Sequence, residues 1–120
     1  HNVDSTRKLI KAIDDYFSRF QVVLLFGASE DKDIDGMLKL LSKRAKKIIL
    51  TKAFHPRALE PIEISEVLKT YTNNYIITSN CEDALNYAIE LVGNNQLILA
   101  TGSIFIAAAI RNLWTGSKKL

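Results

Sequence analysis

The stretch VVLLFG, residues 22–27, decides how the rest of the chain is read. Five apolar residues follow one another without a polar break, and a glycine closes the run. Such a run is typical of a β-strand that is covered on both faces, as in a parallel sheet. Three more short apolar runs are expected to be strands of the same kind, at residues 48–50, 75–77 and 97–100.

Segments with apolar residues at helical spacing alternate with these runs. We expect Asp4 or Ser5 to cap the first helix, whose apolar face includes Phe17, and Asn80 to cap the fourth. The predicted helices cover about 4–20, 34–41, 61–71, 81–92 and 104–114. Helices that alternate with uniformly apolar strands predict an α/β fold, a Rossmann-like three-layer sandwich with a mainly parallel sheet.

Composition is consistent with one domain, residues 1–120, because 48% hydrophobic residues suffice for a core of this size. The net charge of +3 comes from interspersed signs, so the sequence indicates no nucleic-acid partner. The longest apolar segment, LILATGSIFIAAAIR, is broken after four residues and is too short for a membrane span.

A single cysteine, Cys81, excludes an internal disulfide, and we expect it to be a structural residue in a cytoplasmic protein. The chain opens at His1 without an initiator Met and has no signal peptide, so we expect a fragment of a longer protein. An upstream segment could then supply a further strand.

Parallel strands all end at one edge of the sheet, and ligands of such folds bind beyond that edge. The exits are residues 27–33, 51–57, 78–80 and 101–103. Lys32 is either a solvated loop residue or a cation directed at a ligand, and Arg57 is suited to a carboxylate or phosphate. Thr101-Gly-Ser103 is expected to make the turn into the last helix, where Ser103 could both cap that helix and contact an anion.

Several motifs of nucleotide and metal sites are absent. The sequence has no Gly-x-x-x-x-Gly-Lys-Ser/Thr loop, no Gly-x-Gly-x-x-Gly after the first strand and no spaced Cys/His set for zinc. Two hypotheses from different classes therefore stay open on the residues alone. One is a stand-alone small-molecule or nucleotide-binding module of flavodoxin-like type, and the other is a structural domain whose ligand edge would be filled by apolar side chains.

An ordered set of short motifs resembles the C-terminal domain of the Mur ligase superfamily, in its folylpolyglutamate synthase and dihydrofolate synthase branch. His1-Asn2 matches the end of an Asp-Gly-Ala-His-Asn motif. The other pieces follow in the family's order: FGASEDKD at 26–33 before Met37-Leu38, Pro56-Arg-Ala58 before Glu60-Pro61, and Thr101-Gly-Ser103 before Ile-Phe.

The resemblance implies an enzyme that uses ATP to join glutamate to the carboxylate of a pterin or folate substrate through an acyl phosphate. ATP and Mg would be bound mainly by a missing N-terminal ATPase domain of the same chain. This domain would close over that site, which would exclude water from the reactive intermediate. Alone, it is expected to be inactive.

The same resemblance implies roles for individual residues. Lys32 matches the lysine of a Gly-x-x-x-x-Lys loop and would pair with a glutamate carboxylate. Ser103 would donate to that carboxylate, and His1 corresponds to the motif histidine beside the glutamate and nucleotide site. Arg57 is a further candidate for the nucleotide or a substrate.

Overall fold

The computed structural model describes residues 2–53, 55–93, 95–102, 106–107 and 109–111. Helices and strands alternate along it as the apolar pattern predicts. The elements are α1 Val3–Tyr16, β1 Gln21–Phe26, α2 Ile34–Leu41, β2 Ala45–Leu50, α3 Pro61–Leu68, β3 Tyr75–Ile77, α4 Cys81–Leu91 and β4 Gln96–Thr101.

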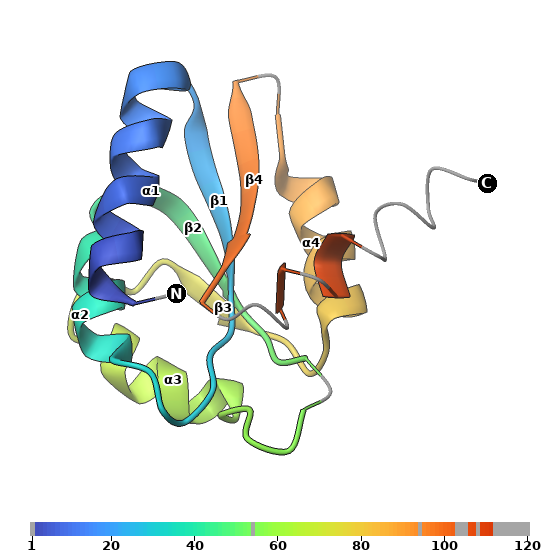
Figure 1. The fold of residues 1–120 in the computed structure, drawn as a ribbon. Coiled ribbons are helices and arrows are strands. Elements are labelled where there is room, and N and C mark those ends of the chain that lie inside the picture. The colour runs from blue at the N-terminus through green and yellow to red at the C-terminus, as the bar shows by residue number, and fades with distance from the viewer. Residues whose placement is uncertain (1, 54, 94, 103–105, 108, 112–120) are drawn as a thin grey trace.

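The four strands form one parallel sheet in the order β3-β2-β1-β4. Helices α1, α2 and α3 cover one face, and α4 covers the other (Figure 1). The predicted α/β three-layer fold is confirmed. Among the described helices, none is long and apolar enough to cross a membrane.

Strand β1 is buried on both faces, so its side chains supply two separate apolar clusters. Val22, Leu24 and Phe26 pack with α1, α2 and α3. Val23 and Leu25 pack with α4 and with Ile106 and Ile110 of the chain that follows β4. These five of the six β1 side chains are at most 2% exposed, and burying one such side chain contributes about 1.5–3 kcal/mol.

Helix α1 begins earlier than predicted, because Asn2 rather than Asp4 or Ser5 is its N-cap. The Asn2 side chain accepts a hydrogen bond from the Ser5 backbone N–H at 2.9 Å. The prediction placed the cap close to the first apolar residues of the helix. Instead, the side-chain oxygen of Asn2 accepts from an N–H of the first turn that has no partner within the helix.

The same helix ends at Tyr16, not near Phe20, because Arg44 holds the chain that follows it. The Arg44 guanidinium donates to the carbonyl oxygens of Phe17 and Phe20 at 3.4 and 3.1 Å. It also pairs with Asp14 at 2.9 Å. Phe17 was predicted on the buried face, but it is 44% exposed.

Three other boundaries differ from the prediction or extend it. β2 starts at Ala45 rather than residue 48, since its first residues pair with β1 through the backbone and need no apolar side chains. α3 ends at Leu68 rather than Tyr71, where the Tyr71 N–H bonds to the Leu68 carbonyl in a tighter turn. Of the last predicted helix, the described residues 106–107 and 109–111 are helical.

Two glycines allow the ends of β1, β2 and β4 to approach closely. A Cβ on Gly27 would lie 2.6 Å from the Thr51 carbonyl oxygen and 2.5 Å from Ile106 Cδ1. Gly102 has a φ of +111°, and a Cβ there would lie 2.1 Å from the Gly27 carbonyl oxygen. Both positions therefore require glycine.

We expect Gly102→Ala to lower the free energy of unfolding by about 1–3 kcal/mol, because alanine is strained at this φ and its methyl group meets the Gly27 carbonyl. Urea denaturation measures the change. Gly93→Ala is the matched control, since the nearest atom to a Cβ there is Gln96 Oε1 at 4.0 Å. Equal stability of the two variants would contradict the close approach.

Candidate functional site

The chain leaves β1 and β4, which are neighbours in the sheet, toward opposite faces. After β1 it enters α2 on one face, and after β4 it continues to Ile106 on the other face. Ligands of parallel α/β sheets bind at such a switch point. We call the loops 27–33 and 51–60 together with Thr101 and Gly102 the carboxyl-edge site.

The loop after β1 is held in shape by its own polar side chains. The Ser29 hydroxyl donates to Asp31 Oδ1 at 2.7 Å, and the Lys32 backbone N–H bonds to the Ser29 carbonyl at 3.2 Å. Asp33 ends the loop as the N-cap of α2, where it accepts from the Gly36 N–H at 3.1 Å. These contacts fix the backbone on both sides of Lys32.

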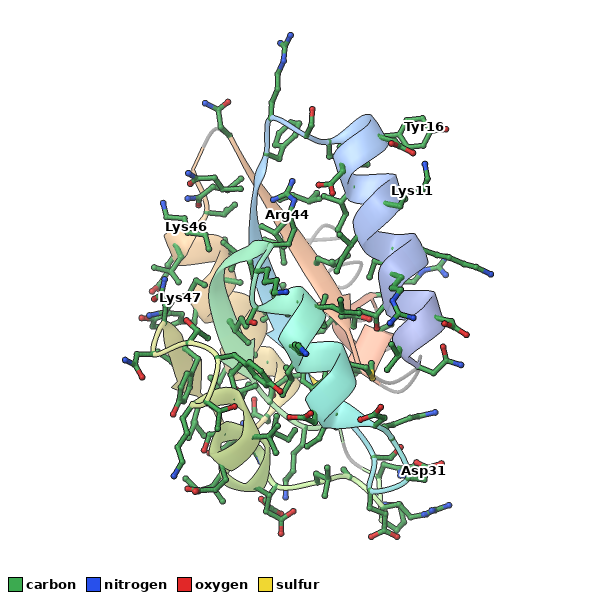
Figure 2. The ribbon with its side chains drawn as sticks, turned by 90° about the vertical axis from the view of Figure 1, so that its left-hand side faces the viewer. Lys11, Tyr16, Asp31, Arg44, Lys46 and Lys47 are labelled. Carbon is green, nitrogen blue, oxygen red and sulfur yellow. The ribbon has the colours of Figure 1, made fainter. Side chains whose placement is uncertain are left out.

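The Asp31 carboxyl is exposed at the tip of this loop (Figure 2). The Ser29 hydroxyl that donates to it lowers the pKa of Asp31 below its ordinary value of 3.8, with further contributions from its own backbone N–H and from the charges of Lys32 and Arg57. Asp31 is therefore negative at neutral pH and stands beside two cations.

The loop after β2 is joined to the loop after β1 by backbone and side-chain contacts. The Glu30 N–H donates to the Arg57 carbonyl at 3.0 Å, and the Leu59 N–H donates to the Ala28 carbonyl at 2.9 Å. Arg57 Nε also pairs with Glu30 Oε1 at 3.2 Å. This ion pair is exposed, so it contributes little to stability. The Arg57 guanidinium is nevertheless already paired with a carboxylate of this chain.

A small pocket lies between these two loops. Ser29, Lys52, His55 and Ile106 are among its lining residues. Lys52 is paired with Glu60, and the Nδ1 atom of His55 accepts from the Arg57 N–H at 3.2 Å. The other lining residues, Ala28, Ala53 and Ala58, are apolar like Ile106, so the pocket has a mixed lining rather than the wholly apolar one that the structural hypothesis predicted.

Lys32 differs from the other two cations of the carboxyl-edge site. Its side chain is partly buried, and among the described residues its ammonium forms no ion pair or hydrogen bond, whereas Arg57 and Lys52 each have a carboxylate partner. The Asp31 carboxylate lies near enough for its charge to interact with Lys32, but no ion pair joins the two side chains. A cation held on a fixed loop in this way is suited to binding an anionic ligand.

The predicted site residues can be placed in part. Lys32 and Arg57 lie on joined loops at one edge of the sheet. The Gly27 N–H donates to the Thr101 carbonyl at 3.3 Å, so the end of β4 adjoins the same loop. His1 and Ser103 lie outside the described residues.

Sequence reasoning missed the residues that hold the site together. It did not predict that Glu30 pairs with Arg57 or that Ser29 binds Asp31. The spacing of Ser29 and Asp31, two positions apart in a turn, is a usable local signal. The Glu30–Arg57 pair joins residues 27 positions apart, and neither residue type nor spacing identifies it.

Cys81 is at the first position of α4 and is buried, 6% exposed. Its Sγ lies 3.5 Å from the Lys52 carbonyl, and burial raises the pKa of the thiol. This environment agrees with the expected structural role. Across the part of the chain that the structure describes, no three His, Cys, Asp or Glu side chains are grouped to hold a metal ion.

A family model described as "Mur ligase, glutamate ligase domain" matches residues 1–104. The chain is 23% identical over 111 residues to a dihydrofolate synthase/folylpolyglutamate synthase of Bacillus subtilis (strain 168), a match that covers 92% of this chain and 25% of the relative.

Solved structures give the same result. Mycobacterium tuberculosis folylpolyglutamate synthase complexed with ADP matches 95% of this chain and 28% of its own, with a TM-score of 0.87 and 25% identity. Folylpolyglutamate synthase from Thermotoga maritima matches 97% of this chain and 26% of its own, with a TM-score of 0.82 and 25% identity. The chain therefore spans about a quarter of the length of these relatives.

We predict that Ser29→Ala raises the pKa of Asp31 toward 3.8, because the hydroxyl that stabilises the carboxylate is lost. An NMR titration that follows the Asp31 carboxyl carbon measures this pKa. In the native chain the lowered pKa stabilises the fold above the ordinary pKa, and this contribution is lost as the pH falls through the lower, folded value.

Ser42→Ala is the control for this measurement, since the Ser42 hydroxyl donates to the Lys39 carbonyl at the end of α2. The control should leave the Asp31 titration unchanged. An Asp31 pKa that stays low in Ser29→Ala would show that the hydroxyl is not its main cause.

Proposed function

This chain belongs to the Mur ligase family, in which it matches the glutamate ligase domain, and we propose that it is the C-terminal, substrate-closing domain of an ATP-dependent folylpolyglutamate/dihydrofolate synthase. The observation that carries the proposal is the match over 95% of the chain to a folylpolyglutamate synthase structure, at a TM-score of 0.87. The parent enzyme would join glutamate to a pterin or folate carboxylate in the cytoplasm.

In the proposed reaction a carboxylate oxygen of the pterin substrate attacks the γ-phosphorus of ATP, an acyl phosphate forms and ADP leaves. The glutamate amine then attacks the carbonyl carbon, the C–N bond forms, the C–O bond to phosphate breaks, and phosphate and the amine proton leave. The part of this domain is to position glutamate and to exclude water when it closes over the site of the other domain.

We assign the glutamate carboxylate contact first to Lys32. Its ammonium forms no ion pair among the described residues, although the Asp31 charge lies near it, and the Ser29–Asp31 and Asp33 contacts hold its loop. We also propose Ser103 and His1 as contacts to the same ligand, on the motifs that they match. Arg57 is the weaker candidate for the nucleotide or a substrate, because Glu30 already occupies its charge.

ATP and Mg are proposed to bind mainly outside this chain. The described residues offer no cluster of metal-ligating side chains, and the sequence has no phosphate-binding loop of the Gly-x-x-x-x-Gly-Lys-Ser/Thr type. The residues of this chain therefore do not fit a complete phosphoryl-transfer site, which needs a cradle of backbone donors, a lysine and a metal.

Substitution of Lys32 tests the glutamate site in the full-length enzyme. We expect Lys32→Ala to raise the KM for glutamate about tenfold or more, since a lost charge-assisted contact costs about 1.5–3 kcal/mol. The KM for the pterin should change much less. Steady-state kinetics with each substrate varied in turn gives both values.

Lys39→Ala is the matched control, because Lys39 is an exposed lysine in the last turn of α2, away from the carboxyl edge. It should leave both KM values unchanged. If Lys32→Ala behaves like Lys39→Ala, Lys32 does not bind glutamate.

The 120-residue chain alone is expected to hydrolyse no ATP and to form no amide, because most of the proposed site belongs to another domain. Its affinity for free glutamate should be about 1 mM or weaker, since a few contacts must offset the lost freedom of the ligand. An ATP turnover assay with magnesium, glutamate and dihydropteroate, beside an NMR titration with glutamate, measures both. Turnover by the purified chain, or micromolar binding, would contradict a shared site.

A further inference from the structure

Basic residues are concentrated in one part of the chain. Residues 36–59 contain seven Lys and Arg and no Asp or Glu, so all 13 acidic residues lie elsewhere. Four of these cations fall within residues 42–47, Ser-Lys-Arg-Ala-Lys-Lys, where α2 has ended and β2 begins. A local excess of one charge creates a field that attracts an oppositely charged partner.

Three of these four cations are not neutralised by any residue that the structure describes. Arg44 is already occupied by Asp14 and by two backbone carbonyl groups. The side chains of Lys43, Lys46 and Lys47 form no ion pair or hydrogen bond within the described part of the chain. Lys43 and Lys46 are exposed, and Lys47 is partly exposed. We call these three residues the lysine cluster.

The backbone beneath Lys46 and Lys47 is held from both sides. On the β1 side Lys47 pairs with Val23, and Lys46 is an extra residue at an irregularity of the register, as in a β-bulge. On the β3 side the Asn74 side-chain amide donates to the Lys46 carbonyl. A bulge redirects a side chain, and Figure 2 shows Lys46 and Lys47 on the same side of the molecule. A fixed backbone reduces the entropy that is lost when a partner binds.

The lysine cluster is separate from the carboxyl-edge site. β2 begins at Ala45 and ends at Leu50, so its first residues lie at the opposite end of the sheet from the loops of that site. Figure 2 shows Lys46 and Lys47 well away from Asp31, which lies at the tip of the loop after β1. A partner bound at the lysine cluster therefore leaves the glutamate site open.

The chemistry of the cluster favours carboxylates over phosphates, bases or lipid. Its cations are ammonium groups, whereas the guanidinium that best binds phosphate in a bidentate manner is occupied in Arg44. Residues 42–47 include no aromatic side chain for a base to stack on and no large apolar side chain to enter a membrane. The exposed ring of Tyr16 lies on the other side of Arg44 from Lys46 and Lys47 (Figure 2).

We propose that the lysine cluster, Lys43, Lys46 and Lys47, docks an acidic segment of a partner protein, an extended polypeptide with several aspartate or glutamate side chains. This surface goes beyond the proposed ligase function and does not depend on it. Because the three ammonium groups are at the surface, the interaction is transient and weakens as salt screens the charges.

Fluorescence anisotropy with the full-length enzyme and a labelled peptide of alternating aspartate and serine tests the docking. In low salt we expect binding below about 1 mM peptide. The triple variant Lys43→Gln/Lys46→Gln/Lys47→Gln should bind about tenfold more weakly, because each exposed lysine–carboxylate contact is worth about 1.5-fold to fivefold in affinity. Replacing the same three lysines by arginine keeps the charges and should keep the binding.

Lys8→Gln/Lys11→Gln/Lys69→Gln is the matched control, since it removes the same charge from three exposed lysines elsewhere. It should change the affinity by less than about twofold. Equal losses in the two glutamine variants, loss of binding in the arginine variant, or no binding of the peptide to the native enzyme would overturn the proposal. Tighter binding of oligothymidine or of phosphatidylserine vesicles through the same lysines would also overturn it, in favour of a nucleic acid or a membrane.

The Lys32→Ala variant separates this surface from the glutamate site. It should bind the aspartate peptide as tightly as the native enzyme, whatever its glutamate KM. Loss of peptide binding in Lys32→Ala would show that the peptide occupies the carboxyl-edge site, and this would contradict a separate docking surface.

Discussion

The close approach of three backbones at Gly27 governs the carboxyl edge of this sheet. The ends of β1, β2 and β4 meet there with no room for a Cβ on Gly27 or Gly102. The polar side chains nearest the strand ends, Thr51 and Thr101, are buried, so the exposed polar groups of this edge lie elsewhere. They come from the loops a few residues further along, and the contacts of Ser29 and Glu30 are needed to hold those loops in place.

Most of the fold could be predicted because β1 is apolar on both faces and because helical spacing is regular between the strands. The errors lie where contacts distant in sequence decide a boundary. Arg44 ends α1 by binding the carbonyl groups that follow Tyr16, and no local pattern around residue 16 contains that information. The early start of β2 has a related cause, because Ala45 and Lys47 pair with Val22 and Val23 of β1, with an irregularity of the register at Lys46 between them.

The site was predictable to the level of the edge and its loops, but not to the level of its ion pairs. Parallel strands place Lys32 and Arg57 at one edge whatever their side chains do. Glu30 forms an ion pair with Arg57, and Glu60 forms one with Lys52. The packing of two loops against each other decides where these carboxylates lie. The structure thus separates two lysines and an arginine that look equivalent in the sequence.

The position of β4 beside β1 also has a cost in chain entropy. Gln21 and Gln96 face each other across 75 positions of sequence, whereas β2 follows β1 after about 25 residues, and loop closure over the longer distance costs about 1 kcal/mol more. The strand pair that forms the switch point is therefore the least local contact of the sheet. The stability of the ligand edge therefore depends on the pairing of β1 with β4, two strands that lie far apart in the sequence.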